Sequence, residues 1–327
     1  MASDLSVQSN VFRHQARQAT ERSPLYSDLC EHLAEDPRVA DIVESPPRWD
    51  APLRLLSGLH YLVLTGSASW DSIDQALVQH RDFLRGFVST QHVQTNEVQR
   101  CWLLLPCFLE VSRMTGARSF DLVELGPSAG LNLVWDQYRY EYAAGTWGDS
   151  SARVALSGTE RRRVPEELLQ IRPRVVSRVG IDINPVDVST KEGALRLKSL
   201  VWPDQTWRLE LLDRAIRSFR ELDPPPEILE GNLVELLPSV LAERSGDALT
   251  VVWQTAVLHY LSEEDRKGFR QILRTRGEQH PLAFVETSRP DTASDNYWGL
   301  FIELWPGGER RQVAYADFHG AWLDWLT

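Results

Sequence analysis

The stretch from Phe120 to Trp135 reads FDLVELGPSAGLNLVW and decides how the rest of the chain is interpreted. Residues 120–125 form an apolar pattern typical of a buried strand, and a carboxylate, Glu124, lies near its end. The small residues 126–130 follow, and residues 131–135 are compatible with a helix. Small residues let the backbone turn sharply, and the first turn of a helix presents unpaired N–H groups. The stretch therefore predicts a ligand-binding loop after a strand.

The pattern is helical on the N-terminal side of this stretch. Ser23 and Pro24 form a good N-cap and first helical position, and Leu residues then recur every four positions along one face. Further helical runs are predicted at 52–64, 72–88 and 97–114. We therefore expect an all-helical N-terminal domain over residues 1–117.

Strand patterns alternate with helical runs after residue 117, which predicts a parallel sheet with helices on both faces. The strand candidates are Phe120–Leu125, Val175–Ile181, Glu227–Glu230, Leu249–Trp253 and Leu282–Glu286. Two more strands, Trp298–Trp305 and Gln312–Ala316, flank a Pro-Gly-Gly-Glu turn and predict an antiparallel hairpin. The expected fold is α/β, with a doubly wound, mostly parallel sheet over 118–327 and insertions at about 136–174 and 194–226.

Composition limits the classes of partner. The chain has 327 residues, 43% of them hydrophobic, and 35 basic against 46 acidic residues give a formal charge of −11. This acidic balance argues against nucleic acid and anionic membranes as partners, since both attract clustered positive charge. The N-terminus has no secretory pattern, the longest apolar stretch is too short to span a bilayer, and three cysteines do not suggest a metal or disulfide framework. A cytoplasmic protein with a small or cationic ligand is expected.

Three interpretations of the loop at 126–130 compete. A dinucleotide fingerprint requires glycine at two positions that Ser128 and Leu131 occupy, which disfavours pyrophosphate. A serine-hydrolase elbow requires Gly-x-Ser-x-Gly, which residues 126–130 match, with His259 and His319 as possible bases. That hydrolase also requires several strands and an oxyanion loop upstream, whereas the preceding residues read as helical.

The third interpretation is a resemblance to class I S-adenosylmethionine-dependent methyltransferases, which have a Rossmann-like fold. Their first motif is a strand, an acid and Gly-x-Gly-x-Gly; Glu124, Gly126, Ser128 and Gly130 are similar to it, with serine at the middle glycine position. A second strand of that fold ends in an acid, which Asp182 in VGIDINP resembles. The interval from Gly130 to Asp182 exceeds the roughly 20 residues of a compact nucleotide-binding unit, so an insertion is required.

The resemblance implies roles for these residues in methyl transfer from S-adenosylmethionine to a small molecule. The glycine loop would wrap the amino-acid end of the cofactor, and Asp182 would accept hydrogen bonds from the ribose. Asn232 and Leu233 would contact the adenine, and Gln254 would lie near the transferring methyl group. His259 is a candidate base toward the acceptor. A non-catalytic ligand-binding protein on the same fold also stays open.

Further specific segments are VQTNEVQR at 93–100, the loop with WDQYRY at 135–140, GID at 180–182, VWPDQ at 201–205 and HGAWL at 319–323. On these segments, nearly the whole chain resembles an uncharacterised bacterial family, domain of unknown function 2332. In this interpretation Trp202, Asp204 and Gln205 are expected over the carboxyl ends of the strands, and Tyr138 and Tyr140 are candidates for the substrate pocket. Packing of these aromatic residues within the insertion is the competing explanation.

Overall fold

The computed structural model describes residues 2–45, 47–244, 246–288 and 297–327, with side chains from residue 6 onward. The chain forms two compact units. One contains Met1–Thr95 and Val186–Asp213, and the other contains Asn96–Pro185 and Arg214–Thr327. This division differs from the boundary expected at 117, because the helix that ends at Thr115 packs on the sheet: Phe108 contacts Trp253 edge to face, with ring centroids 5.3 Å apart.

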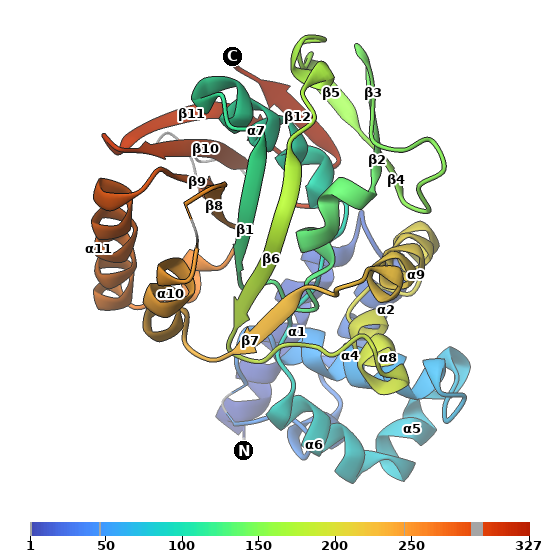
Figure 1. Ribbon diagram of the computed structural model, residues 1–327. Coiled ribbons are helices and arrows are strands. Elements are labelled where there is room, and N and C mark those ends of the chain that lie inside the picture. The colour runs from blue at the N-terminus through green and yellow to red at the C-terminus, as the bar shows by residue number, and fades with distance from the viewer. Residues whose placement is uncertain (1, 46, 245, 289–296) are drawn as a thin grey trace. The chain divides into compact units, whose positions relative to one another are not determined.

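The first unit is helical. Ser23 caps its second helix as expected, since its Oγ accepts a hydrogen bond from the N–H of Tyr26 at 3.2 Å. The run expected over 72–88 divides at His80 into two helices. The helices of this unit, most of them labelled in Figure 1, are α1 Ala2–Ala19, α2 Pro24–Leu33, α3 Pro37–Ala40, α4 Ala51–Leu64, η1 Trp70–Ser72, α5 Ile73–Gln79, α6 Arg81–Thr90 and α8 Lys191–Ser199.

The second unit contains a nine-stranded, mostly parallel sheet, so the chain is a mixed α/β protein. The strands lie in the order β5-β12-β11-β10-β9-β8-β1-β6-β7. The five strands from β9 to β7 are parallel, and β10, β11 and β12 follow in antiparallel pairing. Their bounds are β1 Ser119–Leu125, β5 Thr159–Arg162, β6 Arg174–Asp182, β7 Glu227–Glu230, β8 Leu249–Gln254, β9 Leu282–Ser288, β10 Trp298–Trp305, β11 Glu309–Ala316 and β12 Trp322–Trp325.

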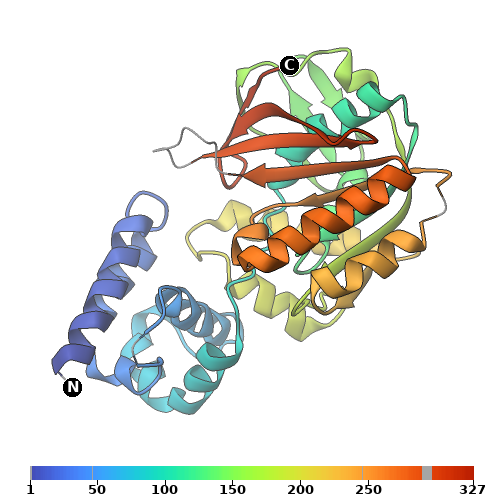
Figure 2. The same cartoon turned by 90° about the vertical axis from the view of Figure 1, so that its left-hand side faces the viewer.

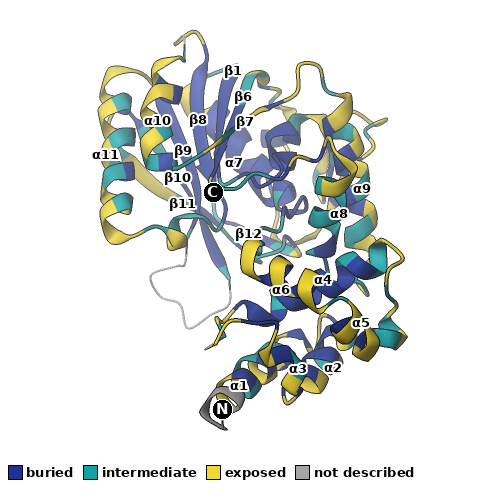
Figure 3. Ribbon diagram, turned by 90° about the horizontal axis from the view of Figure 1, so that it is seen from below, coloured by how far each residue is buried: buried dark blue, intermediate teal, exposed yellow. Residues whose placement is uncertain are grey.

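The five predicted parallel strands and the hairpin are confirmed within a few residues. Helices α10 Leu233–Ala242 and α11 Glu263–Gln279 lie on one face of this sheet (Figure 2). They cover Val123 and Leu125, whereas α7 Arg100–Thr115 covers the opposite face through Phe108. Figure 3 shows the resulting burial, with dark strands and exposed outer faces on α10 and α11. Helix α9 Thr206–Glu221 begins in the first unit and ends in the second.

The α-helix expected directly after the glycine loop is absent from the structure. Residues Leu131–Gln137 form a 3₁₀ segment, η2, with a non-helical kink at Val134. The hydroxyl of Tyr138 donates to the Leu131 carbonyl at 2.7 Å. In an α-helix this carbonyl would accept the N–H of Trp135, four residues later. The chain then forms a small sheet of β2 Arg139–Tyr142, β3 Gly145–Trp147 and β4 Ala155–Ser157, and a short η3 at Leu168–Gln170.

Candidate functional site

The loop after β1 turns through three residues with left-handed backbone. Gly126 has φ 66°, Ser128 has φ 56° and Gly130 has φ 76°. The N–H of Gly126 donates to the carbonyl of Ile181 on β6, and a Cβ at this glycine would lie 2.2 Å from the Val257 side chain. Glycine is therefore required here both for the turn and for the close approach of the loop after β8.

Two side chains hold this loop. Asp182, at the carboxyl end of β6, is 5% exposed; its Oδ2 accepts the N–H of Ser128 at 2.8 Å and its Oδ1 accepts the N–H of Asn184 at 2.9 Å. Asn96 Oδ1 accepts the N–H of Leu131 at 3.0 Å. The predicted neighbourhood of Asp182 and the glycine loop is therefore present, and Asp182 also shapes the loop itself.

Glu124 lies directly beneath the loop, on the face of β1 that α7 covers. Its side chain is 2% exposed, and its Oε2 has no hydrogen-bond partner among the residues that the structure describes. Burial, reinforced by the charge of Asp182, raises its pKa to about 8, although the side chains of Trp253 and Asn132 act in the opposite direction. Glu124 is therefore largely protonated at neutral pH.

The loop after β8 belongs to the same edge of the sheet. Gln254 is buried; its Nε2 donates to the carbonyl of Thr287 at 2.9 Å and its Oε1 accepts the N–H of Val257 at 2.9 Å. Ala256 has φ 62°, and together with Ser128 it makes up the non-glycine residues with positive φ among those described. Strained backbone at the ends of two adjacent strands is a feature that clusters at functional sites.

The remaining predicted residues of this unit have visible structural contacts. Asn232 caps α10, because its Oδ1 accepts the N–H of Val234 at 2.8 Å, and Leu233 packs in the core beneath that helix. His259 is exposed on the short η4, Leu258–Tyr260, where its ring lies 4.0 Å from that of Tyr260. Each residue follows a strand at the carboxyl edge, as expected from the sequence.

Tyr138 and Tyr140 are fully buried within the crossover between β1 and β6. Their hydroxyls donate 2.7 Å hydrogen bonds, Tyr138 to the Leu131 carbonyl and Tyr140 to the Trp135 carbonyl. Burial raises the pKa of both phenols well above the usual value. Both tyrosines therefore pack within the insertion, which is the competing explanation given above for these aromatic residues. A role of the two tyrosines in substrate binding stays a prediction.

Trp202, Asp204 and Gln205 lie in the first unit. The ring of Trp202 is 5.9 Å from that of Tyr26, Asp204 accepts a hydrogen bond from the N–H of Leu25 at 3.3 Å, and Gln205 donates to the carbonyl of Arg22 at 2.9 Å. The segment thus packs on the beginning of α2. The glycine loop, Asp182 and Gln254 all belong to the second unit.

Sequence reasoning did not assign a role to the segment before α7. Asn96 contacts the glycine loop, and Arg100 donates to the carbonyl of Phe318 at 3.0 Å and to Thr255 Oγ1 at 3.3 Å. The guanidinium of Arg100 also lies 4.8 Å from the Trp298 ring. The available signals were the family resemblance of VQTNEVQR and its dense run of polar residues just before an apolar helix.

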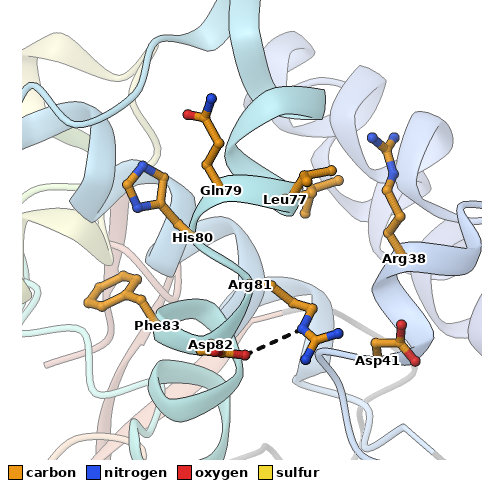
Figure 4. A pocket seen from close by; sticks show the side chains of 9 residues that line it. Arg38, Asp41, Leu77, Gln79, His80, Arg81, Asp82 and Phe83 are labelled. Carbon is orange, nitrogen blue, oxygen red and sulfur yellow. Dashed lines mark hydrogen bonds and ion pairs between the residues drawn. The ribbon is translucent and has the colours of Figure 1, made fainter.

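The first unit contains a surface hollow. Figure 4 shows its lining, which comes from α3, α5 and α6 and includes Arg81 paired with Asp82 at 3.3 Å. Nearby, His32, Asp36 and Asp74 bring possible metal ligands within 4.8 Å of one another. The guanidinium of Arg38 binds both aspartates and lowers the pKa of each, so a protein cation already occupies this position.

These features define a mixed α/β protein with a strained, small-residue loop and two buried acids at the carboxyl edge of a mostly parallel sheet. The chain belongs to the bacterial family described as "Uncharacterized protein conserved in bacteria (DUF2332)", whose sequence model matches residues 9–325. No curated protein matches the chain. Across the described residues, none of the helices has the length and apolar character needed to cross a membrane.

Proposed function

We propose that this chain binds S-adenosylmethionine at the glycine loop and transfers its methyl group to a small-molecule acceptor. The position of the loop carries the proposal. Numbered along the chain, the five parallel strands follow the order 3-2-1-4-5, as in doubly wound nucleotide-binding folds. Connections diverge between β1 and β8, and ligands of such sheets bind outside this switch point. The loops carrying Gly126 and Val257 meet there.

The charge around the loop favours a cationic ligand. Glu124 and Asp182 are both buried, and the charge of Asp182 is one reason that the pKa of Glu124 is raised. A sulfonium or ammonium group near these acids would favour the ionised form of Glu124 beside Asp182, whereas a pyrophosphate would disfavour it further. This chemistry supports S-adenosylmethionine over a dinucleotide.

The chain offers plausible groups for each part of this cofactor. Gly126, Ser128 and Gly130 would follow its amino-acid end, and Asp182 would hold the ribose hydroxyls. A carboxylate has about four acceptor positions, and Asp182 accepts the backbone N–H groups of Ser128 and Asn184. Asn232 and Leu233 would border the adenine, with Gln254 near the methyl group. The bound cofactor would supply an electrophilic methyl group on a positively charged sulfur.

One observation favours a serine hydrolase. Ser128 follows a strand and has left-handed backbone, as the serine of a strained strand-to-helix turn does. However, a hydrolase presents that serine at the surface of its site, whereas Ser128 is 5% exposed and η2 replaces the helix. The hydrolase is therefore the second candidate.

Calorimetry with the full chain tests the proposal. We expect saturable binding of S-adenosylmethionine at one site, with proton release near neutral pH, because a cation beside Glu124 favours its ionised form. The heat will then depend on the ionisation enthalpy of the buffer, and this dependence should disappear in Glu124→Gln. Glu235→Gln, which changes an exposed acid on α10, is the matched control.

Two results would contradict the proposal. One is the absence of S-adenosylmethionine binding by a folded protein. The other is covalent labelling of the parent chain by a fluorophosphonate probe that is lost in Ser128→Ala, since such labelling indicates a nucleophilic serine.

A further inference from the structure

The loop between β11 and β12 carries a histidine that the proposed cofactor site does not use. The Nδ1 of His319 lies 3.4 Å from Oε2 of Glu97, just before α7. We propose that Glu97 and His319 form a carboxylate–imidazole pair that acts as the general base toward the acceptor. Its catalytic role rests on the proposed methyl transfer, whereas the pair itself can be tested without it.

The burial of the two groups suits a base. Glu97 is 4% exposed. The His319 side chain is 41% exposed, whereas its Nδ1 is buried, lies 3.4 Å from Glu97 Oε2 and makes no hydrogen bond to the described residues. A carboxylate beside Nδ1 favours the tautomer with hydrogen on that nitrogen, which leaves the Nε2 lone pair available to take a proton.

The surrounding contacts fix the histidine loop. Asp317 Oδ2 accepts the N–H of His319 at 2.8 Å, and Gln99 Nε2 donates to the Gly320 carbonyl at 3.3 Å. Arg100 donates to the Phe318 carbonyl at 3.0 Å. These contacts hold the backbone on both sides of His319, so the loop loses little freedom when a substrate binds.

Strand directions place the pair at the same edge of the sheet as the glycine loop. β9 is parallel to β1 and β8, and two antiparallel pairings make β11 run in the same direction. The loop that follows β11 therefore lies at the carboxyl edge. The segment holding Glu97 also reaches the neighbouring loops: Asn96 binds the N–H of Leu131, and Arg100 binds Thr255. The charged groups facing His319 from these elements are Glu97, Arg100 and Asp317.

The chemistry requires one proton acceptor. An acceptor O–H or N–H that takes the methyl group must lose its proton, while the electron pair of the broken sulfur–carbon bond stays on sulfur. His319 Nε2 takes that proton, and the Glu97 carboxylate stabilises the resulting imidazolium. His259, the base suggested by sequence, is held instead beside the ring of Tyr260.

Nitrogen NMR of the full chain with labelled histidine tests the pair directly. At alkaline pH we expect the neutral His319 ring to carry its hydrogen on Nδ1 in the parent protein. Glu97→Gln should shift the population toward the Nε2–H form that free imidazole prefers, with the His259 signals unchanged. An Nε2–H tautomer in the parent protein would overturn the pair, even if the variant does not fold.

Addition of S-adenosylmethionine separates this inference from the proposed function. With saturable binding in calorimetry, we expect the His319 ring signals to shift on addition while those of His32, in the first unit, do not. Binding without any change at His319 would overturn its role as base and leave the cofactor proposal standing. No binding, in contrast, would remove the proposed function and the catalytic role together, and the tautomer measurement would still decide the pair.

Discussion

Two buried glutamates in the same sheet differ in how their charge is compensated. Glu124 on β1 is 2% exposed and Glu286 on β9 is 3% exposed. Glu286 binds two guanidinium groups, Arg270 at 2.8 Å and Arg310 at 2.8 Å, on the face that α11 covers. Glu124 has no such ion pair among the described residues, and its pKa rises to about 8.

The comparison separates a buried acid that arginines neutralise from a buried acid that has no ion pair among the described residues. Burying an ionised carboxylate costs several kcal/mol unless counter-charges repay it, as the arginines do at Glu286. At Glu124 the cost is met by holding a proton, which places an ionisable group next to the glycine loop. Strongly perturbed acids in such positions are candidates for functional sites.

The largest expected effect is on the pH dependence of stability in Glu124→Gln. The pKa of Glu124 is about 8 in the folded chain against an ordinary value of 4.5, so the unfolded chain loses this proton first. The contribution is fully favourable below about pH 4.5 and is lost as pH rises through about 8, by up to about 5 kcal/mol. Glutamine removes this loss, so the variant should be the more stable protein at alkaline pH.

Urea unfolding across this pH range measures the effect. Glu235→Gln, which removes an exposed acid, should follow the parent curve within about 0.5 kcal/mol. Parallel curves for the parent protein and Glu124→Gln would show that Glu124 is already ionised in the folded chain.

The opposite result is expected for Glu286→Gln. Glutamine leaves Arg270 and Arg310 without their shared carboxylate, although Arg270 keeps Glu303 at 2.6 Å. Since both arginine side chains are about a third exposed, we expect a loss of about 2–3 kcal/mol, below the range for a fully buried pair. Urea unfolding at neutral pH measures it. If both glutamine variants were equally destabilised, the contrast between the two acids would fail.

The sequence predicts features that neighbouring residues determine, but not features that depend on contacts between residues farther apart in the chain. Strand patterns that alternate with helical runs predicted the five parallel strands, and small residues after an acid predicted the loop. The helix expected at 131–135 failed because Tyr138, which lies beyond it, takes the Leu131 carbonyl. The break at His80 likewise has no strong local signal.

The candidate site was predicted where its residues follow strands directly. Glu124, Asp182 and Gln254 lie at the ends of neighbouring strands, so strand prediction alone places them near one another. The Glu97–His319 pair depends on the direction of β11 and on α7 packing, which the sequence does not give. Similarly, nothing local indicates that Trp202 packs against Tyr26.

The Asp182→Ala variant tests whether Asp182 contacts the ligand. Asp182→Ala should weaken S-adenosylmethionine binding about 10- to 150-fold, or about 1.5–3 kcal/mol, because hydrogen bonds to a charged acceptor are lost. Asp182 also holds the N–H groups of Ser128 and Asn184, so thermal unfolding must accompany the calorimetry. Asp121→Ala, which changes a buried acid on β1, is the control. Equal affinity in the parent protein and Asp182→Ala would remove Asp182 from the site.

The smallest effects are expected for Ala and Gly at Ser128, where the competing functions require different side chains. With φ 56°, this residue has a backbone that glycine adopts without strain, so Ser128→Gly should change stability by no more than about 1 kcal/mol. Ser128→Ala should lose at most one neutral hydrogen bond of about 0.5–1.5 kcal/mol in cofactor binding.

Ser128→Leu completes the series because a bulky side chain would block close approach of a ligand to the loop, although the backbone N–H to Asp182 remains. We therefore expect calorimetry to give near-parent affinity for Ala and Gly and none for Leu, with thermal unfolding checked for each variant. A hydrolase predicts a different order, since both Ala and Gly remove its nucleophile and with it many powers of ten in turnover. Tolerance of Ala and Gly would therefore assign this strained position to ligand approach rather than to nucleophilic chemistry.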